Sequence, residues 1–267
     1  MITLQELLSL KTDLFSKSNT LLVRHKDSRV EYRDILKDRE KLLEYQKYQS
    51  RTIFKDAHYL ISFIGQERRK SLLFGIFKIN GVQSIDKGFY YDIEELNICE
   101  DLVDRVVVDW GKASLAWVQY YHKNSKEVLE ILPKGYLGDF PGLTNFILDF
   151  QELKRLVDNP DANREWKSHL SSINGIYMIL DKSTGSQYIG SACGNGGVWQ
   201  RWAEYSKTRH GNNIILADLC NDVEYHKNFQ FTVLQTLPSN LSNKEVIKLE
   251  NLYKKKFGTK TFGLNKN

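Results

Sequence analysis

Residues 174–192 read NGIYMILDKSTGSQYIGSA, and this stretch decides the fold of the last third of the chain. Two apolar runs flank residues 181–185, whose Asp, Ser, Thr and Gly are typical of a turn. The stretch therefore predicts a β-hairpin. Its tyrosines, Tyr177 and Tyr188, lie on different strands, and both phenols can reach one surface. Aromatic packing between any two neighbouring strands would explain the same placement.

The hairpin contains two short segments of a longer series, and the whole series is a more specific signal than the hairpin alone. In chain order the segments are GIY (175–177), YIG (188–190), WQRW (199–202), GNN (211–213), FQFTVL (229–234), IKLENLY (247–253) and FGLN (262–265). Together they resemble the GIY-YIG nuclease family over about residues 173–267. Residues 1–170 resemble the front part of a group of bacterial GIY-YIG proteins, which adds nothing about function.

The resemblance implies a role for each matching residue. Arg201 would face the active site, and Tyr205 would share its helix face one turn later, where other members carry His or Tyr. Tyr177 would be the general base, assisted by Tyr188. A phenol with a pKa near 10 needs a neighbouring cation for this role. Supporting positions are Gly175, Gly190 and Asn265, of which Asn265 is expected to be structural.

Phosphodiester hydrolysis needs a metal or another source of positive charge, and the resemblance supplies Glu250 as the metal ligand. A single carboxylate suits Mg²⁺, or Mn²⁺ as a substitute, because Mg²⁺ keeps several of its waters. The alternative is a surface carboxylate paired with Lys254 at i+4. Arg201 offers a planar fork to phosphate oxygens. The alternative for Arg201 is stacking between its neighbouring tryptophans.

Weaker signals surround these residues. His210 in a polar loop, and the run Lys254, Lys255 and Lys256, are candidate contacts to the DNA backbone, although solvated surface explains them equally well. The Gly-rich loop 191–197 lacks the Gly-Lys-Ser/Thr ending of a P-loop, so we expect no nucleotide cofactor.

Charge and composition limit the remaining possibilities. The 267 residues carry a net charge of +5, all of it within residues 171–267. This asymmetry weakly favours a polyanionic partner such as DNA, with ordinary solvated surface as the alternative. No apolar run is long enough to cross a membrane, and no secretory signal is visible. Three scattered cysteines fit a reducing, cytoplasmic setting without a disulfide framework.

The amino-terminal part follows different patterns. Helices are predicted after Thr3 and over residues 32–45, and short apolar runs between residues 58 and 132 predict a small antiparallel, barrel-like sheet or a curled sheet. The turn after the second strand is placed at Asn80-Gly81. Residues 145–170 predict two helices. We therefore expect an α+β protein: an α+β domain over 1–150, a helical connector over 151–170, and a small mixed sheet with flanking helices in a nuclease domain over 171–267.

The leading functional hypothesis is a Mg²⁺-dependent DNA endonuclease in restriction, defence or repair. Residues 1–150 would select the target, and their many aromatic side chains could stack a flipped or modified base or simply fill a core. The alternatives are a non-catalytic nucleic-acid-binding module and a homing-type endonuclease. Cutting both strands needs two active sites or one that reorients, so a homodimer is a reasonable expectation.

Overall fold

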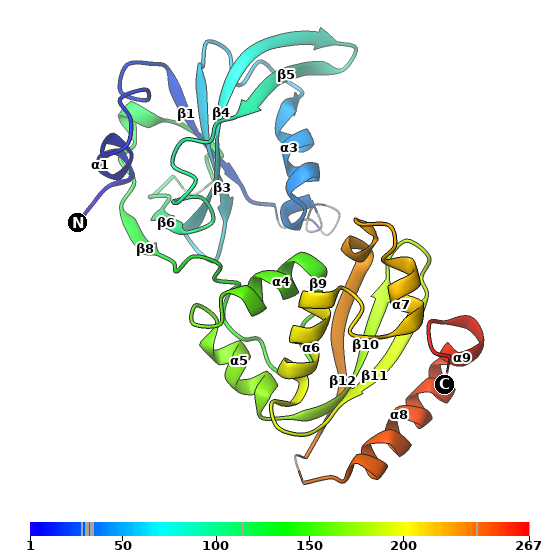
Figure 1. Ribbon diagram of the computed structural model, residues 1–267. Coiled ribbons are helices and arrows are strands. Elements are labelled where there is room, and N and C mark those ends of the chain that lie inside the picture. Colours follow the sequence, from blue (N-terminus) through cyan, green and yellow to red (C-terminus); the bar gives the residue numbers. More distant parts are fainter. Residues whose placement is uncertain (28, 30–31, 33–34, 114, 239, 267) are drawn as a thin grey trace. The chain divides into compact units, whose positions relative to one another are not determined.

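The chain forms two compact units, Met1–Pro133 and Lys134–Asn267, shown in Figure 1. The computed structural model describes residues 1–27, 29, 32, 35–113, 115–238 and 240–266. Each unit packs helices against its own sheet, which confirms the expected α+β class.

The first unit is a curled sheet with a helix on each face (Figure 1). Its elements are α1 (Leu4–Ser9), β1 (Thr20–His25), the 3₁₀ helix η1 (Ile35–Lys37), α3 (Arg39–Lys47), β2 (Tyr48–Gln49), β3 (Tyr59–Gly65), β4 (Lys70–Ile85), β5 (Gly88–Glu95), β6 (Val106–Asp109), β7 (Val118–Tyr120), the 3₁₀ helix η2 (Tyr121–Lys123) and β8 (Val128–Ile131). The strand order is β2-β5-β4-β3-β1-β7, and β6 pairs with β4 and β8. Leu8 of α1 and Leu42 of α3 belong to separate apolar cores.

The sheet of this unit is curled, which is one of the two forms that the sequence predicts, but its strands are mixed rather than wholly antiparallel. Strand β1 pairs in parallel with β3, and the sheet path ends at β2 and β7. The sequence did not predict β1, because Arg24 and His25 break its apolar run, yet both side chains are buried. The prediction of a turn at Asn80-Gly81 is wrong. Strand β4 continues through a bulge there, and the chain turns at residues 86–87.

The predicted helix over residues 32–45 starts later than expected. Asp38 accepts a hydrogen bond from the backbone N–H of Lys41, so it caps α3 and separates it from η1. Residues 33 and 34 of that prediction lie outside the described part of the chain. The predicted N-cap at Thr3, with its capping box to Glu6, is confirmed.

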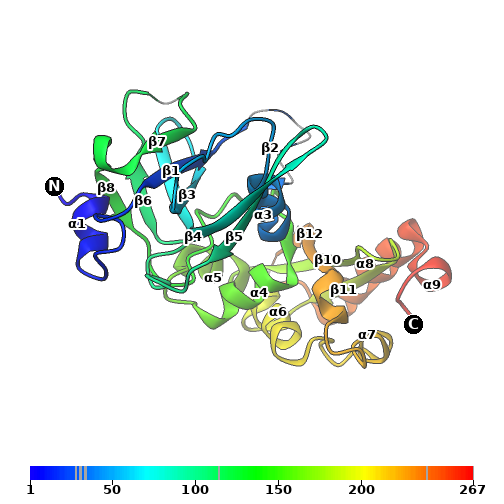
Figure 2. The same ribbon diagram turned by 90° about the horizontal axis from the view of Figure 1, so that it is seen from above.

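The second unit is an antiparallel sheet between two layers of helices. Its elements are β9 (Leu148–Asp149), α4 (Phe150–Asp158), α5 (Arg164–Ser171), β10 (Asn174–Asp181), β11 (Gln187–Ala192), α6 (Gly197–Thr208), α7 (Ile214–Leu219), the 3₁₀ helix η3 (Tyr225–Asn228), β12 (Phe229–Leu237), α8 (Asn243–Phe257) and α9 (Thr259–Phe262). The strand order is β11-β10-β12-β9, with every pairing antiparallel rather than mixed. Helices α6 and α8 lie on opposite sides of this sheet (Figures 1 and 2).

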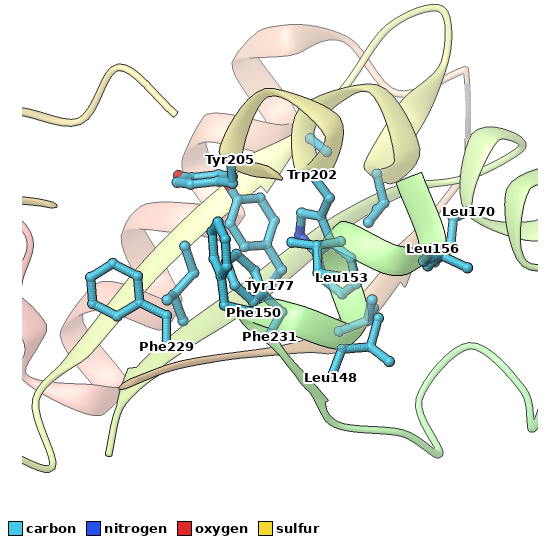
Figure 3. Packing of buried hydrophobic residues seen from close by; sticks show 14 of the residues in the cluster. Leu148, Phe150, Leu153, Leu156, Leu170, Tyr177, Trp202, Tyr205, Phe229 and Phe231 are labelled. Carbon is cyan, nitrogen blue, oxygen red and sulfur yellow. The ribbon is translucent and has the colours of Figure 1, made fainter. Parts of the chain in front are cut away.

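Helices α4 and α5 were expected to connect two domains, and the compact units divide ahead of them, between Pro133 and Lys134. The reason is their apolar side chains. Leu153 and Leu156 of α4, with Trp166 and Leu170 of α5, fill the core beneath α6. Figure 3 shows Leu153, Leu156 and Leu170 in the same cluster as Tyr177 and Trp202. Burying four such side chains contributes on the order of 6–12 kcal/mol of transfer free energy.

Two further expectations can be compared with the described residues. Within the ranges given above, no helix combines the length and the apolar character needed to cross a membrane. Cys99, Cys193 and Cys220 are free thiols, and burial raises the pKa of Cys99 and Cys220.

Candidate active site

The hairpin of β10 and β11 places the sequence-predicted tyrosines on one face of the sheet. Tyr177 pairs with Gly190 and Ile179 pairs with Tyr188, so these four residues share a face. Ser191, one position further along β11, points to the other face. The turn is held by Asp181, whose buried carboxylate accepts hydrogen bonds from Ser183, Thr184 and Tyr225. Local chemistry at the turn thus fixes the register of both strands.

Arg201 lies on α6 and is held by three side chains. Its Nε donates to the Tyr177 hydroxyl at 3.2 Å, and its Nη2 donates to the Tyr205 hydroxyl at 3.4 Å. Its Nη1 binds the carboxylate of Glu204 at 2.6 Å. The Tyr177 and Tyr205 hydroxyls are themselves 3.1 Å apart. These contacts engage three of the five N–H groups of a guanidinium, so two others can serve an incoming anion.

Burial sets the charge state of this cluster. Tyr177 and Tyr205 are fully buried, and Figure 3 shows their rings among Trp202, Phe150 and Phe231. Burial is the main reason that the pKa values of both phenols lie above the usual value, although Arg201 partly opposes the shift. Burial would lower the pKa of Arg201, but Tyr177, Tyr205 and Glu204 raise it on balance. The cluster is therefore a charged guanidinium held by neutral phenols.

Two glycines leave the space that the two buried phenols occupy. A Cβ atom at Gly190 would lie 2.4 Å from the Tyr177 hydroxyl oxygen and 2.5 Å from Cζ of the same ring. Gly211 has a φ of +53°, and a Cβ there would lie 2.6 Å from the ring of Tyr205. Normal carbon contacts are about 3.5–4.0 Å. Glycine is thus needed at both positions for the phenols to reach Arg201.

Glu250 lies on α8, across the sheet from Arg201. One carboxylate oxygen accepts a hydrogen bond from the hydroxyl of Ser191, and the other is 2.7 Å from Nζ of Lys254. The side chains of Glu250 and Lys254 are only 16% and 10% exposed, so this is not an ordinary surface pair. Because β11 ends the strand order, the two faces meet along its free edge. Gly190 touches the first cluster and the adjacent Ser191 touches the second.

Asn265 closes part of that edge. Its side-chain nitrogen donates to the Ile189 carbonyl at 2.9 Å, and its side-chain oxygen accepts from the Ile189 N–H at 2.9 Å. The side-chain amide therefore makes the two hydrogen bonds to Ile189 that a neighbouring strand would otherwise make. Asn265 is 4% exposed, so water could replace these bonds only if the chain end moved away.

The sequence-predicted residues thus fall into two clusters and a periphery. Tyr177, Arg201 and Tyr205 come together, and the ring of Tyr188 lies 6.5 Å from that of Tyr177. No described contact joins them to Glu250. In the periphery, Lys255 and Lys256 are exposed, and Gly175 packs tightly against Val198 and Gln235. The Nδ1 atom of His210 accepts a hydrogen bond from the backbone N–H two residues on.

Sequence reasoning missed two partners in the clusters, Ser191 and Glu204. Ser191 was read as the residue after the YIG segment and as part of the Gly-rich loop 191–197, whereas it lies on β11 and points to the other face from Gly190. Glu204 is three positions after Arg201 on a predicted helix, which is the spacing of an ion pair. The pair Glu250–Lys254 forms as the i+4 alternative anticipated.

A metal requirement can be compared with the donor atoms at Glu250. Among the described residues, no three His, Cys, Asp or Glu side chains gather into a metal-binding group. The Glu250 carboxylate on α8 and the Ser191 hydroxyl on β11 are oxygen donors that fit a cation keeping most of its waters, as Mg²⁺ does, once the Lys254 ammonium has moved from its place 2.7 Å from the carboxylate. They do not fit a metal that needs a complete protein cage.

Comparison with known proteins adds little to this geometry. No protein-family model and no curated protein matches the sequence. Two solved structures of the catalytic domain of the homing (intron) endonuclease I-TevI are similar to part of it. A mutant form is 24% identical, covers 36% of this chain and 94% of its own, and has a TM-score of 0.29. The other is 26% identical, covers 34% and 96%, and has a TM-score of 0.28. The case for a site therefore rests on the contacts above.

Proposed function

We propose that the second unit is a metal-dependent DNA endonuclease that hydrolyses phosphodiester bonds. One observation carries the proposal: two clusters meet the edge strand at adjacent residues from opposite faces. The Tyr177 hydroxyl, which accepts a hydrogen bond from Arg201, lies against Gly190, and Glu250 accepts a hydrogen bond from Ser191. In this proposal a phosphate lies along the β11 edge, where both clusters contact the strand. The GIY-YIG resemblance of the sequence supports the same assignment.

Arg201 is the proposed phosphate clamp. Its contacts with Tyr177, Tyr205 and Glu204 fix the guanidinium before a substrate arrives, so little order is lost when a phosphate binds. Its side chain is 28% exposed, enough for an anion to reach the N–H groups that these contacts leave over. A preorganised charge of this kind stabilises the more anionic transition state.

The two buried phenols act mainly as positioning groups in this proposal. Their raised pKa values make a phenolate costly at neutral pH. Tyr177 would become a base only if a cation and the attacking water both approached its hydroxyl. Tyr188 is nearer to solvent, at 9% exposed, and its proposed role is to orient that water or the phosphate. Removing one hydroxyl should therefore disturb Arg201 as well as proton transfer.

Glu250, with Ser191 holding one of its oxygens, is the proposed ligand of a Mg²⁺ or Mn²⁺ ion. Such an ion supplies Lewis-acid stabilisation of the phosphate and of the departing oxygen. Ser191 would not bind the ion itself. Its hydrogen bond would orient the carboxylate, as the hydrogen-bonded partners of metal ligands commonly do. We assign target selection in restriction, defence or repair to the first unit, because the roles proposed for Arg201 and Glu250, toward phosphate and metal, do not read sequence.

Purified protein incubated with plasmid DNA and Mg²⁺ or Mn²⁺ tests the proposal. The wild type should cleave, whereas Arg201→Ala and Glu250→Gln should lose about 100-fold or more of the rate. Arg164→Ala and Glu165→Gln, exposed residues of α5, are the matched controls and should cleave normally. Modified and single-stranded DNA belong in the panel, since a strict target requirement would mimic inactivity.

The opposite result has a defined meaning. If wild type and variants are equally inert on every DNA and metal tested, the endonuclease proposal fails. Binding of DNA that depends on Arg201 but never leads to cleavage would instead identify a nucleic-acid-binding module.

A further inference from the structure

Lys254 is the one member of its basic run that is withdrawn from solvent. It is 8% exposed, whereas the neighbouring Lys255 and Lys256 are exposed. Its ammonium is 2.7 Å from Oε1 of Glu250, one helical turn away on α8. Lys254 is therefore not part of the exposed surface that Lys255 and Lys256 form. Its position is defined by Glu250.

The pair leaves Glu250 with both oxygens engaged. Ser191 donates to one oxygen and Lys254 to the other. The hydroxyl of Ser191 is neutral and can stay in place when the carboxylate binds a cation. The ammonium cannot, because a divalent ion on that oxygen would lie within a few ångströms of a like charge in a poorly solvated site. A cation at Glu250 and Lys254 in its present place exclude each other.

A displaced ammonium needs a new anionic partner, since a cation with so little exposure is costly to leave unpaired. A DNA phosphate on the β11 edge is the anion that the proposed function brings to this place. The same phosphate would face Arg201 from the other side of the strand. Lys254 can reach it by rotating its flexible four-carbon side chain, while Ser191 continues to hold Glu250.

We propose that Lys254 is a resident counter-ion that competes with the divalent cation for Glu250 and releases it when a nucleic-acid phosphate arrives. The inference rests on the proposed role of Glu250 as metal ligand. It makes Lys254 a positioning residue that couples two ligands: phosphate favours metal binding, and by linkage metal favours phosphate binding. The free protein would then bind the metal weakly.

Mn²⁺ binding, followed by electron paramagnetic resonance of the free ion, tests the coupling in the full-length protein. The probe for phosphate is thymidine 3′,5′-bisphosphate, which has no phosphodiester bond to hydrolyse. Wild type should bind Mn²⁺ weakly alone and about tenfold more tightly with the bisphosphate. Lys254→Met should bind Mn²⁺ about tenfold more tightly than wild type without the bisphosphate, and should gain little when it is added.

Two further variants keep the result interpretable. Lys254→Arg retains the charge and should keep the weak binding of the free protein. Lys254→Gln retains a hydrogen-bond donor without charge and should show the tighter binding, also if Lys254→Met fails to fold by circular dichroism. Equal or weaker Mn²⁺ binding by the uncharged variants, with binding still abolished by Glu250→Gln, overturns the inference alone. Mn²⁺ binding that ignores Glu250 in every protein refutes the proposed metal site instead.

Discussion

Gly190→Ala is the sharpest test of how the site is built, because it adds one methyl group beneath Tyr177. The new Cβ would lie 2.4, 2.5 and 2.8 Å from the hydroxyl oxygen, Cζ and Cε2 of that ring. Restoring contacts of about 3.5 Å requires a retreat of about 1 Å. The ring is fully buried against Trp202 and Tyr205 and has little room to move. We expect a loss of about 1–3 kcal/mol in the free energy of unfolding.

The same displacement should lower the cleavage rate by a larger factor than it lowers the stability. The Tyr177 hydroxyl is 3.2 Å from Nε of Arg201, so a shift of about 1 Å breaks that hydrogen bond and releases the guanidinium. Misplacement of this size can lower a rate about 100-fold. Urea unfolding and plasmid cleavage measure the two effects separately. Gly81→Ala is the control, since a Cβ there would meet nothing within 4 Å.

A double-mutant cycle decides whether the ring is the cause. In a Tyr177→Ala background the methyl group has space, so Gly190→Ala should cost almost nothing. If the glycine substitution costs the same with and without the ring, the steric argument is wrong.

Three other predictions use the same structure. Asn265→Ala leaves the buried N–H and C=O groups of Ile189 without their partner and should destabilise the second unit by about 2–4 kcal/mol in urea unfolding. Tyr205→Phe keeps the ring but removes its hydroxyl from Arg201, so we expect slower cleavage with nearly unchanged stability. Burial lowers the pKa of His25 to about 4, although the hydrogen bond that Nε2 of His25 donates to Oε1 of Gln46 opposes the shift. Since the unfolded state takes up the proton first, the first unit should lose about 2 kcal/mol between about pH 7 and about pH 5, and His25→Phe should lack that loss.

Each of these has a control and a contrary result. Exposed Asn221→Ala and His122→Gln should match wild type in the unfolding measurements. An Asn265→Ala protein of normal stability would mean that water satisfies the β11 edge. If Tyr205→Phe cleaves at the normal rate, Tyr205 does not position Arg201. A pH dependence that survives His25→Phe must arise from other groups.

The sequence predicts the second unit better than the first, because the patterns that define the second unit are local. A turn of Asp, Ser, Thr and Gly fixes the hairpin, and the spacing of Arg201 and Tyr205 fixes a helix face. The partners of Arg201 and Glu250 depend on which side chains meet in three dimensions, so Ser191 was missed. In the first unit, β1 is stabilised by distant pairing with β3 and β7, which no local pattern reveals.

The β11 strand makes the spacing of this region intolerant of insertions. Successive side chains on a strand point to opposite faces, so one residue added between Tyr188 and Ser191 would send the serine hydroxyl to the Arg201 side and remove it from Glu250. Residues 193–196, which lie beyond the strand, carry no such constraint and can change in length. A functional descendant of this chain should therefore vary in its loops while keeping the count of residues along β11.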